Sequence, residues 1–229
     1  MSRAGLPGGV AVALVLMIAV ATPAASAAPS ARDRAILAAG VIQPHDVPAG
    51  WVAHKQGAGS ATQFKGISAC KDLAPVLNAA LLTIPHRLSG EFSDPTSGTQ
   101  TTLVANTAYA FKDEAAAARY VAAYRGTSVP TCFTKSLQRA VQSSLQGANA
   151  TISVASLTNL AGLGDDEVGY SVTLTVPTQG EPQTLYDDIV AVRVGRAILG
   201  FNFQNLGAEL PMGPTIIRQG TSRVAPLAT

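Results

Sequence analysis

Two adjacent carboxylates, Asp187 and Asp188, are the strongest candidates for chemistry in this sequence of 229 residues. They lie in a predicted strand, where neighbouring side chains point to opposite faces, so Asp188 shares a face with Tyr186 and Val190. An acid on an apolar face needs a partner. Arg193 has the parity of Asp187 and could pair with it. A solvated strand end or a structural ion pair is the simpler interpretation, and a general acid with a raised pKa is the alternative.

A second acidic group, Asp165, Asp166 and Glu167, follows Gly162 and Gly164 in a predicted loop. Three carboxylates could gather around a divalent cation. The run lacks the alternating ligand spacing of a calcium loop and its closing glutamate. We therefore expect a solvated acidic turn and no metal site there.

The histidines are His45, His54 and His86, and their spacing matches no helical or hairpin metal pair. We expect ordinary loop or surface histidines. The stretch from Gly66 to Cys70 lacks the final glycine of a serine-hydrolase nucleophile elbow. The sequence therefore predicts no catalytic residue, no metal and no cofactor. The alternative is an exported hydrolase that uses one of the two adjacent aspartates.

Cys70 and Cys132 are the two cysteines of the chain. Oxidising compartments favour disulfides and no odd thiol is left over, so one bridge between them is expected. Closing so long a loop would stabilise the fold by roughly 4 kcal/mol in chain-entropy estimates. The alternative is a thiol nucleophile with a histidine partner, which would need one cysteine kept reduced outside the cell.

Residues 1–27 have the pattern of a secretory signal peptide. Arg3 gives a basic start, and the uncharged run from Gly9 to Ala21 is short for a membrane span but suits a signal core. The small residues before Ala28 predict cleavage between Ala27 and Ala28, with no membrane span afterwards. An uncleaved signal anchor is the alternative. No cysteine follows the cleavage region, which argues against a lipid anchor.

The composition excludes some classes of partner. The formal net charge is +2, and no stretch concentrates Lys or Arg. Nucleic acid and anionic membrane surfaces both demand local positive density, so neither is an expected partner. Roughly 200 residues after the signal suit one domain better than two. We expect an N-terminal arm at 28–42, loosely held with at most a short helix, and a single domain over 43–229.

The first half of the domain combines helices with one strand. Apolar residues at helical spacing predict a helix over 71–83. A β-branched and aromatic run predicts a strand over 100–111. Asp113 is the expected N-cap of a second helix that Gly126 and Pro130 should end, with Cys132 just beyond. A short helix over 136–145 is also expected.

The C-terminal third alternates in hydrophobicity and predicts strands linked by hairpins. The Gly195-Arg196 pair suits a two-residue turn. The whole pattern predicts an α+β domain, with a C-terminal antiparallel meander and helices packed on one face. The expected strands and the closing helix cover 151–158, 168–176, 185–194, 197–204 and 215–224.

Several short motifs together resemble the extracellular sensor-domain family of actinobacterial proteins, which includes the C-terminal sensor of PknH-type kinases. The motifs are Pro48 to Trp51, Phe111 to Ala116, Gly164-Asp165 and Asp188 to Gly195, set around the two cysteines. The resemblance implies a non-enzymatic α+β sensor-like domain whose cleft receives an unidentified ligand. This chain has one cysteine pair where the kinase sensor has two.

The leading hypothesis is a secreted, non-catalytic domain that binds a small or cell-envelope ligand between sheet and helices. An exported hydrolase is the first alternative, favoured by a Ser or carboxylate within reach of a His in a cleft. An envelope scaffold with a protein partner is the second, favoured by a large exposed apolar patch. Trp51 is expected mainly to pack over a sheet edge or the disulfide, with ligand stacking as its alternative role. The candidate ligand-binding residues are Trp51, Tyr109, Tyr120, Tyr186, Asp188 and Arg193.

Overall fold

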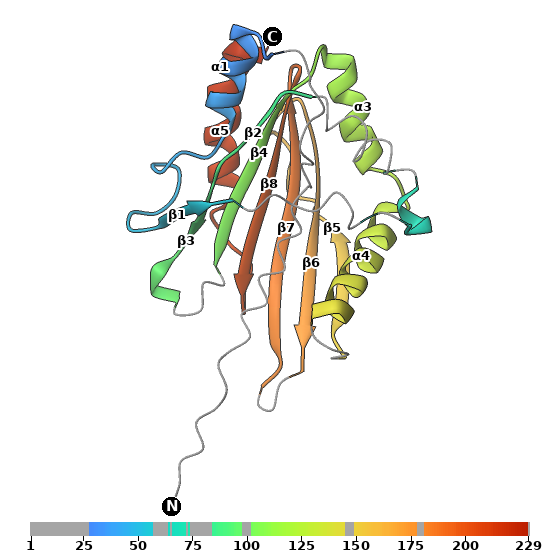
Figure 1. The fold of residues 1–229 in the computed structure, drawn as a ribbon. Coiled ribbons are helices and arrows are strands. Elements are labelled where there is room, and N and C mark those ends of the chain that lie inside the picture. Colours follow the sequence, from blue (N-terminus) through green and yellow to red (C-terminus); the bar gives the residue numbers. More distant parts are fainter. Residues whose placement is uncertain are drawn as a thin grey trace, which may run out of the picture.

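An antiparallel sheet forms the centre of the molecule (Figure 1). In the residues that the structure describes, the sheet has eight strands, and seven of them run in the order β1-β3-β4-β8-β7-β6-β5. The eighth, β2, pairs with β4 along the same edge as β3. The strands are β1 (Val52–Lys55), β2 (His86–Leu88), β3 (Gly90–Ser93), β4 (Leu103–Ala110), β5 (Thr151–Ser156), β6 (Asp166–Val176), β7 (Gln183–Val194) and β8 (Ala197–Leu206). This computed structural model describes residues 28–56, 64, 66–71, 73, 84–97, 102–144, 149–177 and 181–228.

The predicted meander is confirmed. Strands β5 to β8 pair in sequence order, each antiparallel to the next. Gly195 turns the chain between β7 and β8 with a φ of +53°, where a Cβ would lie 2.4 Å from the carbonyl oxygen of Ala228. Only glycine fits this turn without strain. Strand β4 then pairs with β8, so the α+β class with an antiparallel sheet is also confirmed.

Helices cover both faces of the sheet, which corrects the expectation that they pack on one face. Helices α3 (Glu114–Tyr124) and α4 (Val129–Ser144), with the short 3-10 helix η1 (Ser68–Cys70), lie on what we call the disulfide face. Helices α1 (Ala31–Gly40) and α5 (Gly213–Ala228) lie on the opposite face, called the terminal-helix face (Figure 1).

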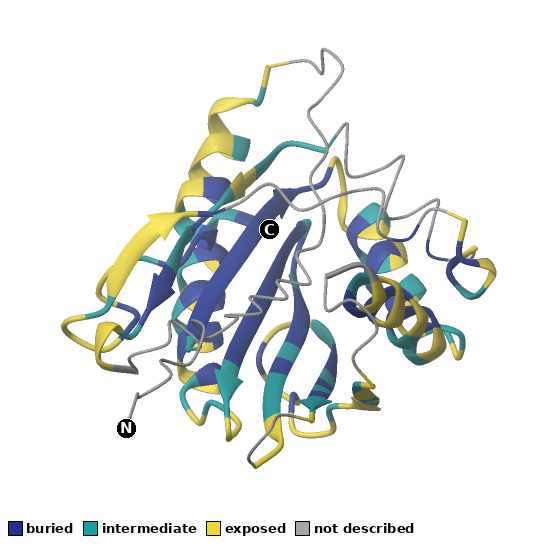
Figure 2. Cartoon of the chain, turned by 60° about the horizontal axis from the view of Figure 1, so that its bottom comes forward, coloured by how far each residue is buried: buried dark blue, intermediate teal, exposed yellow. Residues whose placement is uncertain are grey.

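The strand sequences explain this two-sided cover. Strands β4 and β8 are buried at nearly every position (Figure 2), because apolar residues occupy both parities. On β8, Ile198 belongs to the apolar cluster of the disulfide face, while Leu199 and Phe201 belong to that of the terminal-helix face. A strand that is apolar on both sides needs a packing layer on each.

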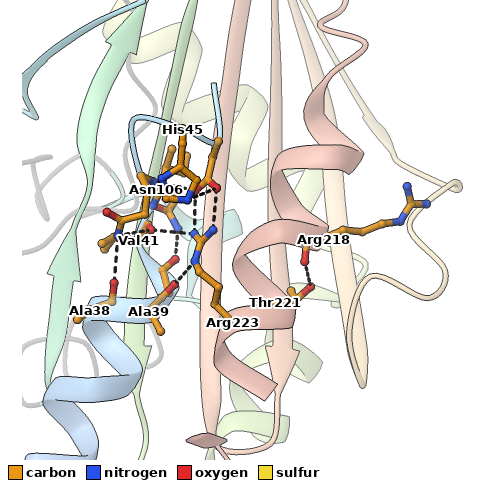
Figure 3. A network of polar contacts seen from close by, with 12 residues as sticks. Ala38, Ala39, Val41, His45, Asn106, Arg218, Thr221 and Arg223 are labelled. Carbon is orange, nitrogen blue, oxygen red and sulfur yellow. Dashed lines mark hydrogen bonds and ion pairs between the residues drawn. The ribbon is translucent and has the colours of Figure 1, made fainter. Parts of the chain in front are cut away.

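The N-terminal segment is packed into the domain rather than forming a loose arm. Helix α1 starts with a capping box between Ser30 and Asp33, and its Ile36 and Leu37 are buried against β4 and α5. Arg223 of α5 points to the chain after α1 and binds Asp46 with two hydrogen bonds of 2.7 and 2.8 Å (Figure 3). The two apolar residues of α1, Ile36 and Leu37, are thus buried by β4 and α5, which lie far from α1 in the sequence.

On the disulfide face, α3 forms as predicted, with Asp113 as N-cap. Pro130 does not end a helix but lies in the first turn of α4, where its missing N–H costs nothing. Cys132 therefore lies inside α4, and its predicted bridge to Cys70 is confirmed, with Cα atoms 4.8 Å apart. The helix predicted over 71–83 lies almost entirely outside the described residues.

Candidate functional site

A buried polar cluster on the disulfide face is the candidate site. Asp187 of β7 accepts a hydrogen bond from Asn202 Nδ2 at 2.5 Å and one from Gln204 Nε2 at 3.1 Å, both from β8. The three residues are 3%, 7% and 3% exposed, respectively. Asp187 and Gln204 are direct cross-strand partners, and Asn202 is the next residue of the same face, so the sheet register itself forms the cluster.

Asp187 has the most perturbed carboxyl group of the described chain. Burial raises its pKa to about 8, against the lowering effect of the hydrogen bonds from Gln204 and Asn202. The negative charge of Asp188 raises it further. No ion pair in the described residues includes Asp187. At neutral pH this carboxyl is therefore mostly protonated.

One atom of the cluster has no partner. Asn202 Oδ1 is buried and accepts no hydrogen bond from any residue that the structure describes. A buried carbonyl oxygen left unpaired costs about 1 to 3 kcal/mol. Such an atom in a native structure calls for an explanation, and a bound molecule is one.

Small residues border part of the cluster on the same face. Across the strands from Asn202 lies Ala105 of β4, and Gly200 of β8 lies opposite Ala191 of β7. None of these three side chains extends beyond a methyl group. The small residues lie on one side of the cluster only, because Ile189 of β7 is the direct partner of Asn202 and Leu103 of β4 is that of Gln204.

An aromatic group lines the same face toward α3. Tyr120 contacts Tyr109, Phe111 and Tyr124, with ring centroids 6.1, 5.4 and 5.2 Å apart. Burial raises the pKa of Tyr109 and of Tyr124 well above the ordinary value. These hydroxyls therefore stay protonated, and they can serve as hydrogen-bond donors rather than as bases.

A serine and a histidine meet at the β1 edge of the sheet. His54 Nε2 lies 3.1 Å from Ser93 Oγ, and Ser93 is buried. Glu91 is the cross-strand partner of His54. Burial raises the pKa of Glu91, and the charge of His54 opposes that shift. This pair satisfies the first geometric requirement for a nucleophile and its general base.

The structure divides the predicted ligand-binding residues between the two faces. Tyr109 and Tyr120 lie together on the disulfide face. Trp51 packs against the apolar cluster of the terminal-helix face and not on the disulfide. Tyr186 and Asp188 have the parity of Val190, which belongs to that same cluster. These three side chains therefore do not share a site with the two tyrosines.

Arg193 is also separate from Asp188. Its guanidinium lies 3.5 Å from Asp165 and donates to the carbonyl of Gly195 at the β7–β8 turn. Asp165 also accepts a hydrogen bond from the Gly195 N–H at 2.6 Å. Asp166 pairs with Arg125, the C-cap residue that follows α3. Asp165 therefore holds the β7–β8 turn, and Asp166 holds the end of α3. The described residues contain no group of three or more His, Cys, Asp or Glu that could hold a metal ion.

Asn202 and Gln204 are the site residues that the sequence reasoning missed. Their signal was the register of the hairpin, since a two-residue turn at Gly195-Arg196 sets Val194 against Ala197 and, further along, Asp187 against Gln204. Two amides facing one acid across a hairpin could have been found from that count.

Comparison with known proteins assigns this chain to no family. No protein-family model matches the chain, and no curated protein matches it. Among solved structures, it is similar to the extracellular domain of PknH from Mycobacterium tuberculosis, at 11% identity and a TM-score of 0.42, over 86% of this chain and 92% of that one. At this level the similarity carries no argument about function.

The helices of the described chain are all too short or too polar to cross a bilayer.

Proposed function

We propose that the protein is an exported, non-catalytic domain that binds a small or cell-envelope ligand at the Asp187 cluster. Residues 1–27 would direct export, with cleavage between Ala27 and Ala28. The bridge between Cys70 and Cys132 suits an oxidising compartment outside the cytoplasm. No cofactor is needed for this role, and a protein partner in the envelope is compatible with it.

The observation that carries the proposal is the uncompensated polar cluster on two central strands. Asp187 is buried with two amide donors but no cation, and Asn202 carries an unpaired oxygen. Burying such groups costs free energy that an apolar residue would not. Perturbed acids of this kind concentrate at functional sites.

Tyr109 and Tyr120 share the face of Asp187 but lie farther along the sheet, because Tyr109 is level with Arg193, six residues along β7 from Asp187 and so about 20 Å away. Tyr109 lies on β4 and Tyr120 on α3, on the same face as Asp187. Trp51, Tyr186 and Asp188 lie across the sheet, and Arg193 is engaged at the β7–β8 turn. We therefore assign none of these six residues a part in this site.

Native mass spectrometry of the protein purified from the organism that makes it tests the proposal. We expect a retained small molecule in the wild type and its loss in Asp187→Asn. The matched control is Asp188→Asn, because that carboxyl is the sequence neighbour on the opposite face and should leave the molecule bound. A molecule held equally by all three proteins, or by none, contradicts the proposal.

The contact between Ser93 and His54 favours a second candidate, an ester hydrolase. Ser93 Oγ would attack the ester carbonyl while His54 Nε2, 3.1 Å away, takes the hydroxyl proton and returns it to the leaving alcohol. Water would then release the acid from the acyl-serine. Hydrolysis of p-nitrophenyl butyrate that falls at least a hundredfold in both Ser93→Ala and His54→Ala would support this activity. Hydrolysis that is unchanged in either variant excludes it.

A further inference from the structure

We propose that the Asp187 cluster binds the ammonium group of a small amine. This inference rests on the proposed function and names the class of ligand. Three observations support it. One buried oxygen of the cluster has no hydrogen-bond partner, no cation lies beside Asp187 in the described residues, and the cluster has few ligands for a metal ion.

Among the described residues, the atom of the cluster that has no hydrogen-bond partner is an acceptor. Asn202 Nδ2 donates one N–H to one oxygen of Asp187, and Gln204 Nε2 donates one N–H to the other. What is left over is Asn202 Oδ1 and the second lone pairs of the carboxylate. An ammonium group has three donors and no acceptor, so it is complementary to this arrangement.

The charge of the cluster points the same way. Once ionised, Asp187 has no cation beside it in the described structure, because the nearest arginine along its strand, Arg193, is turned toward Asp165. An anionic ligand would meet a carboxylate and an unpaired carbonyl oxygen, and both would repel it. A cationic ligand supplies the charge that the protein does not.

The groups around Asp187 do not replace that cation. The same face of the sheet carries Tyr109, Tyr120, Tyr124 and Tyr170, all with pKa values raised by burial. It also carries Arg125 at the end of α3, which is paired with Asp166 of β6. From the opposite face, Asp188 adds negative charge. The tyrosines stay neutral across the physiological range, and no ion pair in the described residues joins Asp187 to a Lys or Arg.

A metal ion fits the cluster less well than an amine. One carboxylate and one unpaired amide oxygen supply few of the six to eight oxygens that calcium takes. In the part of the chain that the structure describes, no third carboxylate or histidine joins them. An ammonium needs only three acceptors, which the cluster can offer.

Binding of an ammonium must be coupled to release of a proton. Free Asp187 holds its proton up to about pH 8, whereas the ion pair requires the ionised form. An alkylamine stays protonated throughout this range, since its own pKa is about 10. Affinity should therefore rise about fifty-fold between about pH 6 and about pH 8, with nearly one proton released per ligand at the lower pH.

The test is calorimetric titration with n-butylamine, in buffers of different ionisation enthalpy, on the disulfide-bonded mature protein. n-Butanol and butyrate serve as neutral and anionic probes of the same length. We expect binding of the amine alone, with the fifty-fold rise and the proton release. Asp187→Asn should abolish binding, and Asp188→Asn should retain it. Asn202→Ala removes one acceptor and should weaken binding about tenfold.

Different failures have different meanings. Equal binding of n-butanol, binding of butyrate, pH-independent affinity or full binding by Asp187→Asn would each overturn the amine proposal. If none of the probes binds and mass spectrometry finds a non-amine molecule that Asp187→Asn loses, the amine proposal fails and the proposed function stands. If no probe binds and no molecule is retained, an internal water on Asn202 is the only occupant, and both fail.

Discussion

Two buried asparagines, one on each face of the sheet, use their amides differently. On the terminal-helix face, Asn106 accepts from the Ile42 N–H at 2.8 Å and donates to the Gly40 carbonyl at 2.8 Å. On the disulfide face, Asn202 donates to Asp187 but leaves its oxygen unpaired. Asn106 joins α1 to β4 and has a complete structural role. Asn202 has one hydrogen-bonding group, its side-chain oxygen, that no described residue satisfies.

The buried acids of the two faces repeat this contrast. Asp46 is held by two hydrogen bonds from Arg223 and one from the Gln43 N–H. Asp187 has two neutral amides and no cation. Asp46 therefore belongs to a closed structural network, whereas Asp187 belongs to an open cluster. Comparison of matched pairs can separate structure from function in this protein.

The largest expected effect is on the pH dependence of stability. The pKa of Asp187 is raised from 3.8 to about 8 on folding, so the folded state keeps a proton that the unfolded state releases. The contribution of this group is greatest below about pH 4 and is lost as the pH rises to about 8. The loss is about 5 kcal/mol in the free energy of unfolding.

Asp187→Asn cannot ionise and should remove this slope, which makes the variant more stable than the wild type at alkaline pH. Urea unfolding at about pH 5 and about pH 9 measures it. Asp188→Asn is the control and should keep most of the slope. A wild type whose stability does not fall over this range would contradict the comparison of the two acids.

The second effect concerns the closed network. Asp46→Asn should destabilise the protein by about 3 to 5 kcal/mol at neutral pH, because it leaves the Arg223 guanidinium without its carboxylate. Thermal or urea unfolding measures the loss. The sign is opposite to that of Asp187→Asn at alkaline pH. A stabilising Asp46→Asn would mean that the two faces do not differ in the way described.

The smallest effect compares the two asparagines. Asn106→Leu leaves the Ile42 N–H and the Gly40 carbonyl without partners and should cost about 2 to 4 kcal/mol. Asn202→Leu loses one hydrogen bond but also removes an unpaired oxygen, so its cost should stay near 1 kcal/mol or below. Urea unfolding at about pH 5, where Asp187 is neutral, gives the difference. Equal costs would remove the distinction.

Much of the fold was predictable where one local signal was sufficient. The N-cap at Asp113, with buried Ala117, Tyr120 and Val121, fixes α3 from its own sequence. Alternation and a glycine turn do the same for β6 to β8. The starting point of α4 was missed because proline both ends helices and begins them, and only its position decides which.

Other features depend on contacts distant in sequence. Strands β1 to β3 are short, and β1 is exposed at every position, so no alternation marks it. Ser89 interrupts β2 and β3 with a side-chain hydrogen bond to the Asn106 N–H. The polar pair Asn202 and Gln204 was missed because a polar residue in an alternating strand is normally assigned to solvent, whereas here both faces are covered.

The packing of α1 against α5 has a consequence for how the chain can fold. The first helix of the domain is buried by the last one, and Arg32 donates to the Leu227 carbonyl near the final residues. No order of emergence from the ribosome or from a membrane channel can complete this face before the C-terminal helix is free. Formation of this face should therefore be a late, cooperative step that follows the release of residues 213–228.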